Sequence, residues 1–272
     1  MSISFKGKVA VVTGGAMGIG EATARRLADL GAAVAILDRD PAAGERVAQA
    51  LRANGKRAAF YECDVAVAAQ VESAVNSAAT AFDGIDVLIS NAGIQRYGDV
   101  ISTTDTVWDE VMAVNLKGCF HAAKYAVPHM MKRESGAIVV VGSVQTFTAV
   151  GNSAAYVTAK HALLGLVRAM SLDHARNNIR VNCVCPGAID TPMLRWAASL
   201  DPDPEKVLAT CGRMHALGRV GKPEEVANAI AFLASDWASF ITGSALMVDG
   251  GMLVPTGGMG FQESGTGAAT KK

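Results

Sequence analysis

Short apolar runs recur along the chain, separated by stretches with the spacing of helices. Seven runs begin near residues 8, 32, 57, 85, 136, 179 and 244. Most are continuously apolar, as in "KVAVVTG" and "GAIVVVGS", and strands covered on both faces have this pattern. Because such strands alternate with helices, the sequence predicts a doubly wound, parallel α/β sheet of the Rossmann type, with seven strands and flanking helices.

Helix signals between the runs agree with this division. The stretch "GEATARRLADLG" ends at Gly31, where a helix C-terminus would fall, and "KPEEVANAIAFLAS" opens with Pro223 and two glutamates. No linker or shift in composition interrupts the alternation, so we expect one domain over residues 1–254. The tail, residues 255–272, is rich in Gly, Thr and Ser, with Met259 and Phe261 as its candidates for docking.

One connection is much longer than the others. Residues 188–221 follow the run that begins near residue 179, and they include Pro192, Pro202 and Pro204. Long insertions after the carboxyl end of a strand are typical of lids over active sites. We therefore expect this segment to cover a substrate site.

Composition narrows the class of protein. Of the 272 residues, 50% are hydrophobic and 18% are charged, and 25 basic residues match 25 acidic ones for a net charge of zero. This balance is globular and favours neither a nucleic acid nor an anionic membrane as partner. The sequence has no secretory signal pattern and no apolar run long enough to span a bilayer, so we expect a cytoplasmic protein.

The five cysteines are an odd number and lie far apart, except for Cys183 and Cys185. A metal site would need further ligands nearby, and the five histidines supply no adjacent cluster. We expect buried free thiols and no metal.

A glycine cluster connects the first run to the first helix. In "VVTGGAMGIGEAT", Gly14, Gly15, Gly18 and Gly20 fall within seven residues. Glycine permits positive φ angles and close approach of the backbone, so main-chain N–H groups and the helix N-terminus can hold a pyrophosphate. The spacing differs from G-x-G-x-x-G, but the position between strand and helix favours phosphate binding over a simple tight turn.

The second run ends in Asp38, which points to the choice of dinucleotide. A carboxylate there can accept hydrogen bonds from the adenosine ribose and would repel a 2′-phosphate. Arg39 is an opposing signal, because a guanidinium could pair with that phosphate. Of these two residues, Asp38 has the inner position. Ala16 and Met17 of the glycine cluster add no second cation, so the sequence favours NAD over NADP.

The stretch "AAYVTAKHALLG" places Tyr156 and Lys160 four residues apart in a small, apolar run. On a helix these side chains share one face. A cation beside a phenol favours the phenolate, which would make the tyrosine usable as an acid or base near neutral pH. The spacing alone is weak evidence, since chance also produces it.

These features belong to a larger set of motifs. The set comprises Thr13-Gly14-Gly15-Ala16-Met17-Gly18-Ile19-Gly20, Asn91-Ala92-Gly93, Asn115, Ser143, Tyr156-x-x-x-Lys160, Pro186-Gly187 and Thr191. In this order and context the motifs resemble those of the short-chain dehydrogenase/reductase (SDR) family over essentially the whole chain. The resemblance implies a dehydrogenase that acts on CH–OH groups with a nicotinamide dinucleotide.

The resemblance also implies roles for individual residues. Tyr156 would be the base in oxidation and the acid in reduction, and Lys160 would assist it and bind the nicotinamide ribose. Ser143 would hold the substrate oxygen and Asn115 would position a water that passes the proton on, although a helix-start serine and a buried structural asparagine are the alternatives. The expected dinucleotide contacts are Gly14, Met17, Gly18, Ile19, Gly20, Asp38, Arg39, Asp64, Val65, Asn91, Gly93, Tyr156, Lys160, Pro186, Gly187, Ile189 and Thr191, with Asp64 and Val65 at the adenine.

The substrate is harder to infer. The positions expected to face it are Gln95, Arg96, Ser143, Gln145, Asn152 and Trp196. Amide and guanidinium groups with one aromatic ring suit a sugar, a polyol or a similar polar alcohol, unless Arg96 and Trp196 serve a subunit contact or the lid. The alternatives are a 3-oxoacyl thioester reductase using NADPH and, disfavoured by the complete catalytic set, a dinucleotide-binding regulator. The resemblance further implies a homotetramer, with the last strand and C-terminus at one interface and the helices flanking the fourth and fifth strands at another.

Overall fold

The strands form one parallel sheet at the centre of the molecule. The computed structural model describes residues 2–254, and the candidate docking residues Met259 and Phe261 lie outside this range. The strand order is β3-β2-β1-β4-β5-β6-β7, and every neighbouring pair is parallel. The predicted seven-stranded, doubly wound sheet is therefore confirmed. Its strands are β1 (Val9–Thr13), β2 (Ala33–Asp38), β3 (Ala58–Glu62), β4 (Val87–Ser90), β5 (Gly136–Val141), β6 (Ile179–Pro186) and β7 (Ala245–Val248).

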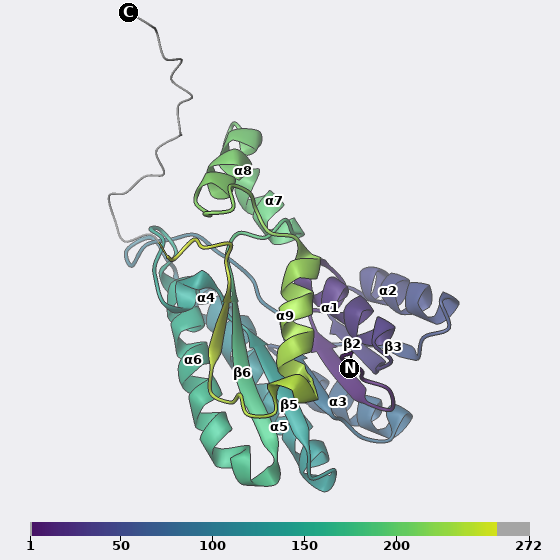
Figure 1. The fold of residues 1–272 in the computed structure, drawn as a ribbon. Helices are drawn as coiled ribbons and strands as arrows, with labels where there is room; N and C mark the ends of the chain where they lie inside the picture. Colours follow the sequence, from purple (N-terminus) through teal and green to yellow (C-terminus); the bar gives the residue numbers. More distant parts are fainter. Residues whose placement is uncertain (1, 255–272) are drawn as a thin grey trace, which may run out of the picture.

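Helices cover both faces of this sheet (Figure 1). One face packs against α1 (Gly18–Asp29), α2 (Pro41–Ala53) and α9 (Pro223–Ala234). The other face packs against α3 (Ala68–Phe82), α5 (Gly118–Lys132) and α6 (Ala154–His174). The remaining elements are α4 (Asp105–Met112), a π-helical turn (Ala113–Lys117) that joins it to α5, and 3-10 turns at Val144–Thr146, Ala175–Asn177 and Asp236–Ala238.

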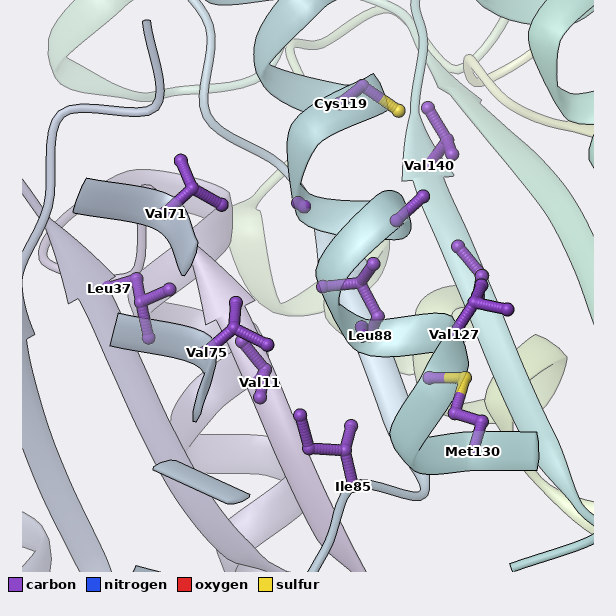
Figure 2. Packing of buried hydrophobic residues seen from close by; sticks show 14 of the residues in the cluster. Val11, Leu37, Val71, Val75, Ile85, Leu88, Cys119, Val127, Met130 and Val140 are labelled. Carbon is purple, nitrogen blue, oxygen red and sulfur yellow. The ribbon is translucent and has the colours of Figure 1, made fainter. Parts of the chain in front are cut away.

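The apolar runs are buried as their continuous pattern predicts. Figure 2 shows Val71 and Val75 of α3, with Val127 of α5, above strand residues that include Val11 and Leu88. Burying one such side chain contributes about 1.5–3 kcal/mol, so two filled layers hold the strands in place. The fixed sheet in turn positions the loops that leave its carboxyl edge.

The long segment 188–221 contains two further helices, α7 (Pro192–Ala198) and α8 (Pro204–Arg213). Each has a proline in its first turn, where the missing N–H has no intrahelical partner to lose. Thr191 caps α7 by accepting a hydrogen bond from Leu194 N–H, and Asp203 caps α8 in the same way from Lys206 N–H. Both helices lie beyond the carboxyl ends of the strands (Figure 1). Among the helices described, none has the length and apolar character to cross a bilayer.

Candidate active site

The glycine cluster forms the turn between β1 and α1. Gly14 and Gly18 have φ angles of +61° and +55°, a conformation that side chains with a Cβ rarely adopt. A Cβ on Gly20 would overlap the carbonyl oxygen of Gly14, and one on Gly14 would lie 2.8 Å from Ala92 Cα. Glycine is therefore required here both for the turn and for close packing against the end of β4.

The N-terminus of α1 can bind an anion. Its N-cap, Met17, makes no side-chain capping bond, so the first N–H groups of this 12-residue helix lack the side-chain acceptor that usually satisfies one of them. Those N–H groups and the helix dipole favour negative charge. Gly18 and Ile19 lie in this first turn, so a pyrophosphate fits these residues.

Asp38 lies beside the same loop, at the end of β2. Its carboxylate is 8% exposed and accepts hydrogen bonds from the main-chain N–H groups of Ala16 (3.0 Å) and Asp40 (3.1 Å). Arg39 is exposed, and within residues 2–254 no Lys, Arg or His forms an ion pair with Asp38. The uncompensated negative charge therefore lies next to the phosphate loop.

Arg46, a nearby residue that the sequence analysis did not identify, forms an ion pair with Glu21. Arg46 of α2 donates to Glu21 Oε2 at 2.9 Å and to the carbonyl oxygen of Ala16 at 3.1 Å. Burial opposes ionisation of Glu21, but hydrogen bonds from Arg46 and Arg25 hold its pKa below the ordinary value. Arg46 is therefore paired with Glu21 beside the glycine loop.

The Asn91-Ala92-Gly93 motif follows β4 and fixes the glycine loop from below. Asn91 Nδ2 donates to the carbonyl oxygens of Thr13 (3.0 Å) and Gly14 (2.9 Å), so its amide supports the loop. A Cβ on Gly93 would lie 2.7 Å from Asn115 Oδ1 and 3.8 Å from Lys160 Nζ. The motif thus brings the predicted dinucleotide and catalytic residues to one place.

Asn115 lies in the π-helical turn between α4 and α5 and is 2% exposed. Its Oδ1 accepts from Ile94 N–H and its Nδ2 donates to Ile94 O, both at 2.8 Å. Both polar atoms of the side-chain amide are therefore hydrogen-bonded to the backbone, which is the arrangement of a buried structural asparagine. π turns occur frequently at functional sites, because they displace the main chain locally.

Tyr156 and Lys160 lie one turn apart on α6, as their spacing predicts. Lys160 Nζ is 5.5 Å from the centroid of the Tyr156 ring, and it donates a 2.9 Å hydrogen bond to the carbonyl oxygen of Val141 at the end of β5. Both residues are buried, with Lys160 only 4% exposed. A buried ammonium is costly unless it is hydrogen-bonded, so its position beside the tyrosine is well defined.

Ser143 follows β5 and begins a short 3-10 turn. Its Oγ accepts from Gln145 N–H (3.1 Å), and its own N–H donates to Thr146 Oγ1 (3.2 Å). Ser143 therefore caps the start of this short helical turn. A hydroxyl that accepts a hydrogen bond can still donate its proton, so Ser143 can also bind a substrate oxygen.

Residues 186–191, which we call the PG loop, begin at the last residue of β6 and adjoin the glycine loop. Pro186 is the last residue of β6 and pairs with Val248 of β7. A Cβ on Gly18 would lie 3.3 Å from Thr191 Cγ2, and Ile189 is buried. Pro186, Gly187, Ile189 and Thr191 thus lie at the carboxyl end of β6, and Thr191 adjoins the glycine loop.

Asp64 and Val65, which the family resemblance places near the adenine, occupy the turn after β3. Asp64 Oδ1 accepts from Ala66 N–H (2.9 Å), and Val65 is buried. A Cβ on Gly118 would lie 2.8 Å from Val65 Cγ2, so the start of α5 packs tightly against this turn.

The predicted substrate residues have diverse surroundings. Arg96 forms a bidentate ion pair with Glu110 of α4, at 2.8 and 3.1 Å, so its guanidinium is already bound by another side chain.

Gln145 Oε1 is buried without a hydrogen-bond partner among the described residues. Asn152 has a φ of +58°, and its carbonyl oxygen accepts from Gly98 N–H, which ties the turn before α6 to the loop after β4. Gln95 is half-buried in that loop, and its carbonyl oxygen accepts from Arg96.

Trp196 of α7 stacks on Tyr97, a residue that sequence reasoning missed. The ring centroids are 6.1 Å apart and the planes differ by 16°. Burial raises the pKa of Tyr97, and the nearby Cys211 and Tyr156 raise it further. An aromatic pair therefore joins segment 188–221 to the loop after β4 close to Tyr156. No sequence pattern links residues 97 and 196.

Four of the five cysteines are buried, and all five are free, as expected. Burial raises the pKa of Cys119 to about 11. The Sγ atoms of Cys183 and Cys185 are 3.6 Å apart on β6, behind the turn that carries Ser143. The hydrogen bond with Cys185 and burial both raise the pKa of Cys183, so neither Cys119 nor Cys183 is a reactive thiolate near neutral pH.

The carboxyl edge of the sheet thus combines a helix N-terminus without a side-chain cap, the Asp38 carboxylate and a buried Tyr–Lys pair, with Ser143 two residues beyond the carbonyl group that holds Lys160. Together they can hold a dinucleotide and exchange a proton with a substrate oxygen. The fold and the site define a nucleotide-binding oxidoreductase of the Rossmann class.

Known proteins agree with this class. A family model described as enoyl-(acyl carrier protein) reductase matches residues 14–253. The cis-4-hydroxycyclohexanecarboxylate dehydrogenase of Sinomonas cyclohexanicum is 44% identical over 92% of this chain and 98% of its own length. The 2-(S)-hydroxypropyl-CoM dehydrogenase 3 of Xanthobacter autotrophicus is 40% identical over 93% of this chain and 99% of its own. The structure of the aldohexose dehydrogenase of Thermoplasma acidophilum superposes with a TM-score of 0.86 and 40% identity, covering 94% of this chain and 98% of that one.

The chain therefore belongs to the short-chain dehydrogenase/reductase family, as the motifs predict. It is an oxidoreductase that acts on CH–OH groups with a nicotinamide dinucleotide.

Proposed function

We propose that this enzyme oxidises a polar secondary alcohol, such as a polyol or sugar, with NAD. Asp38 carries the choice of NAD: its buried carboxylate lies beside the glycine loop without a paired cation among residues 2–254. The two hydroxyls of an adenosine ribose could donate to it. A 2′-phosphate there would meet a like charge, and Arg46 is already neutralised by Glu21.

The catalytic residues divide the proton chemistry among them. The nicotinamide, when bound, accepts the hydride from the alcohol carbon. Tyr156 takes the hydroxyl proton, while the Ser143 hydroxyl donates a hydrogen bond to the same substrate oxygen and orients it. Lys160, held by the carbonyl oxygen of Val141, keeps a positive charge beside the Tyr156 ring, where it can also bind a hydroxyl of the nicotinamide ribose.

Asn115 supplies the route for that proton in this proposal. Its side-chain amide is occupied by Ile94, so a water held by Asn115 would bind to its main-chain carbonyl oxygen in the π turn. Gly93 packs between the two residues, since a Cβ there would lie 2.7 Å from Asn115 Oδ1 and 3.8 Å from Lys160 Nζ, so the Asn115 turn lies close to the ammonium group.

Gln145 supports a polar substrate. Its buried Oε1 is an acceptor without a protein partner, two residues after Ser143, and a second hydroxyl on the substrate could donate to it. The stacked Tyr97 and Trp196 rings would offer the substrate an apolar face. Relatives are named for cis-4-hydroxycyclohexanecarboxylate, 2-(S)-hydroxypropyl-CoM, meso-2,3-butanediol and an aldohexose, and another is named for cyclohexanol, which has a single hydroxyl.

The enzyme is proposed to act as a homotetramer. The edge strand β7 is only half-buried along its length, and Phe240 just before it is fully exposed, so this side offers apolar surface for a second copy. Val100 and Ile101, near the start of α4, are similarly exposed. Light scattering that gave a monomer would contradict this assembly.

A spectrophotometric screen tests the proposal. Purified enzyme is offered NAD or NADP with sugars, polyols, simple secondary alcohols and 3-hydroxyacyl thioesters, and the reduced dinucleotide is recorded by its absorbance. The proposal expects the highest kcat/KM with NAD and a polyol or sugar. Activity confined to NADP and acyl thioesters would replace it with the acyl thioester reductase alternative.

A further inference from the structure

His215 lies between the two ends of segment 188–221, outside the set of motif residues. It follows α8, is 4% exposed, and contacts the PG loop at the start of the segment. The main-chain N–H of Ala188 donates to His215 Nε2 at 3.1 Å, and Nδ1 is 2.7 Å from the carbonyl oxygen of Cys211. The imidazole thus joins α8 to the loop that continues from β6.

These two partners fix the tautomer of the ring. A main-chain N–H can only donate, so Nε2 carries no proton and accepts; a carbonyl oxygen can only accept, so Nδ1 carries the proton. The neutral imidazole with its proton on Nδ1 satisfies both contacts. A side chain without an acceptor at the Nε2 position would leave the half-buried Ala188 N–H without its protein partner.

The PG loop is otherwise held by main-chain bonds. Gly187 N–H donates to Val248 O, while Gly221 accepts from Asp190 N–H and donates to Ala188 O. Gly187 also packs directly against the imidazole, since a Cβ there would lie 2.5 Å from Nε2. His215 therefore supplies the side-chain contact that completes the hydrogen bonding of the loop at Ala188.

We infer that His215 is a positioning residue for the dinucleotide: its Nε2 holds the Ala188 N–H so that the PG loop is ordered on the nicotinamide side of the site. This inference rests on the nicotinamide binding in the proposed function. The residues that carry the effect are Ile189 and Thr191, which continue from Ala188, with Thr191 packed near Gly18. When the loop loosens, the dinucleotide must order it on binding, and its affinity falls.

Three variants separate the hydrogen bond from simple packing. His215→Gln keeps an acceptor oxygen near the position of Nε2, His215→Asn keeps only a donor near Nδ1, and His215→Leu keeps neither. His161→Leu is the matched control, because His161 is exposed on α6 and its Nδ1 lies 2.9 Å from Val157 O, the same contact one turn back in a helix.

The readouts are the dissociation constant of NADH by fluorescence titration, KM and kcat for NAD, and the melting temperature without dinucleotide. We expect His215→Asn and His215→Leu to raise the dissociation constant and KM about tenfold, with kcat changed much less. His215→Gln should stay close to wild type, as should His161→Leu. The Asn and Gln variants suffice if His215→Leu does not fold.

Equal dinucleotide affinity in the Asn and Gln variants would overturn the inference and leave His215 as a packing residue. A wild-type protein that binds neither NADH nor NADPH would contradict the proposed function, and this inference with it. The two failures are distinguishable because dinucleotide binding is measured without any alcohol substrate.

Discussion

The ammonium nitrogen of Lys160 lies 5.5 Å from the centroid of the Tyr156 ring, inside the range of a cation–π contact. The contact involves the ring and does not require the hydroxyl. Replacing tyrosine by phenylalanine therefore removes the acid–base group and keeps the packing between the two side chains.

Tyr156→Phe should lower kcat by at least about 10²-fold, since a positioned general base contributes that much or more. NADH affinity, measured by fluorescence titration, should change less than about threefold because the ring and Lys160 remain in place. Tyr125→Phe, on α5 and packed against the core cluster, is the control and should retain full turnover. Turnover of Tyr156→Phe at the wild-type rate would exclude Tyr156 as the base.

Asp38→Asn should shift the enzyme toward NADP. The amide oxygen can still accept from Ala16 N–H, so the loop keeps its shape while the negative charge disappears. We expect the ratio of kcat/KM for NADP to that for NAD to rise about tenfold or more. Asp40→Asn is the control, because asparagine is an equally good cap for α2. An unchanged ratio in Asp38→Asn would show that another feature selects the dinucleotide.

Two glycine-to-alanine substitutions, at Gly20 and Gly165, should have opposite effects on the stability of the fold. A methyl group on Gly20 would overlap Gly14 O, so Gly20→Ala should abolish NADH binding and lower the melting temperature. A methyl group on Gly165, in the exposed interior of α6, would meet nothing within 4 Å, so Gly165→Ala should stabilise the fold by about 0.5–1 kcal/mol. Thermal unfolding with and without NADH measures both. Full NADH binding by Gly20→Ala would contradict the tight turn.

The acid side of the stability curve should depend on Glu225. Hydrogen bonds from Arg219 lower its pKa to about 2 from an ordinary 4.5. A lowered pKa means that the folded state favours the carboxylate, so the stabilisation is fully present above pH 4.5 and is lost as the pH falls toward 2.

Glu225→Gln should therefore lower the melting temperature by about 1–3 °C at pH 7, a small effect because the pair is partly exposed and screened by solvent. The gap should narrow steadily as the pH falls from 4.5 toward 2, and should shrink in high salt. Glu224→Gln, in the same first turn of α9, should show no such pH-dependent gap. A gap that persisted undiminished at pH 2.5 would assign the loss to the helix cap alone.

Local chemistry made the sheet and the cofactor loop predictable. Strands such as β5 are buried on both faces, and their continuous apolar runs, bounded by glycine, carry that information in a few residues. Likewise, the four-residue spacing of Tyr156 and Lys160 on a helix sets their contact before any tertiary structure is known.

The rest depended on contacts between distant residues. Arg96 was expected to face the substrate, but its carboxylate partner, Glu110, lies on the following helix and only the fold brings the two together. Tyr97 meets Trp196 across about a hundred residues of chain, and His215 is a single histidine without a motif. No periodicity or spacing encodes such pairs, because each depends on how two loops leave the same sheet edge.

Gln145 should decide between a diol and a simple alcohol. Its buried Oε1 accepts nothing from the protein within residues 2–254, so a second substrate hydroxyl would satisfy it in the complex. Gln145→Met has similar length and no acceptor, and should lower kcat/KM for a polyol about tenfold or more, with little change for a monohydroxy alcohol of the same size. Measuring both substrates with one variant provides the control, because misfolding or a displaced Ser143 would lower the two values together. Equal losses on both alcohols would therefore remove Gln145 from substrate recognition and favour the apolar Tyr97 and Trp196 wall as the main determinant.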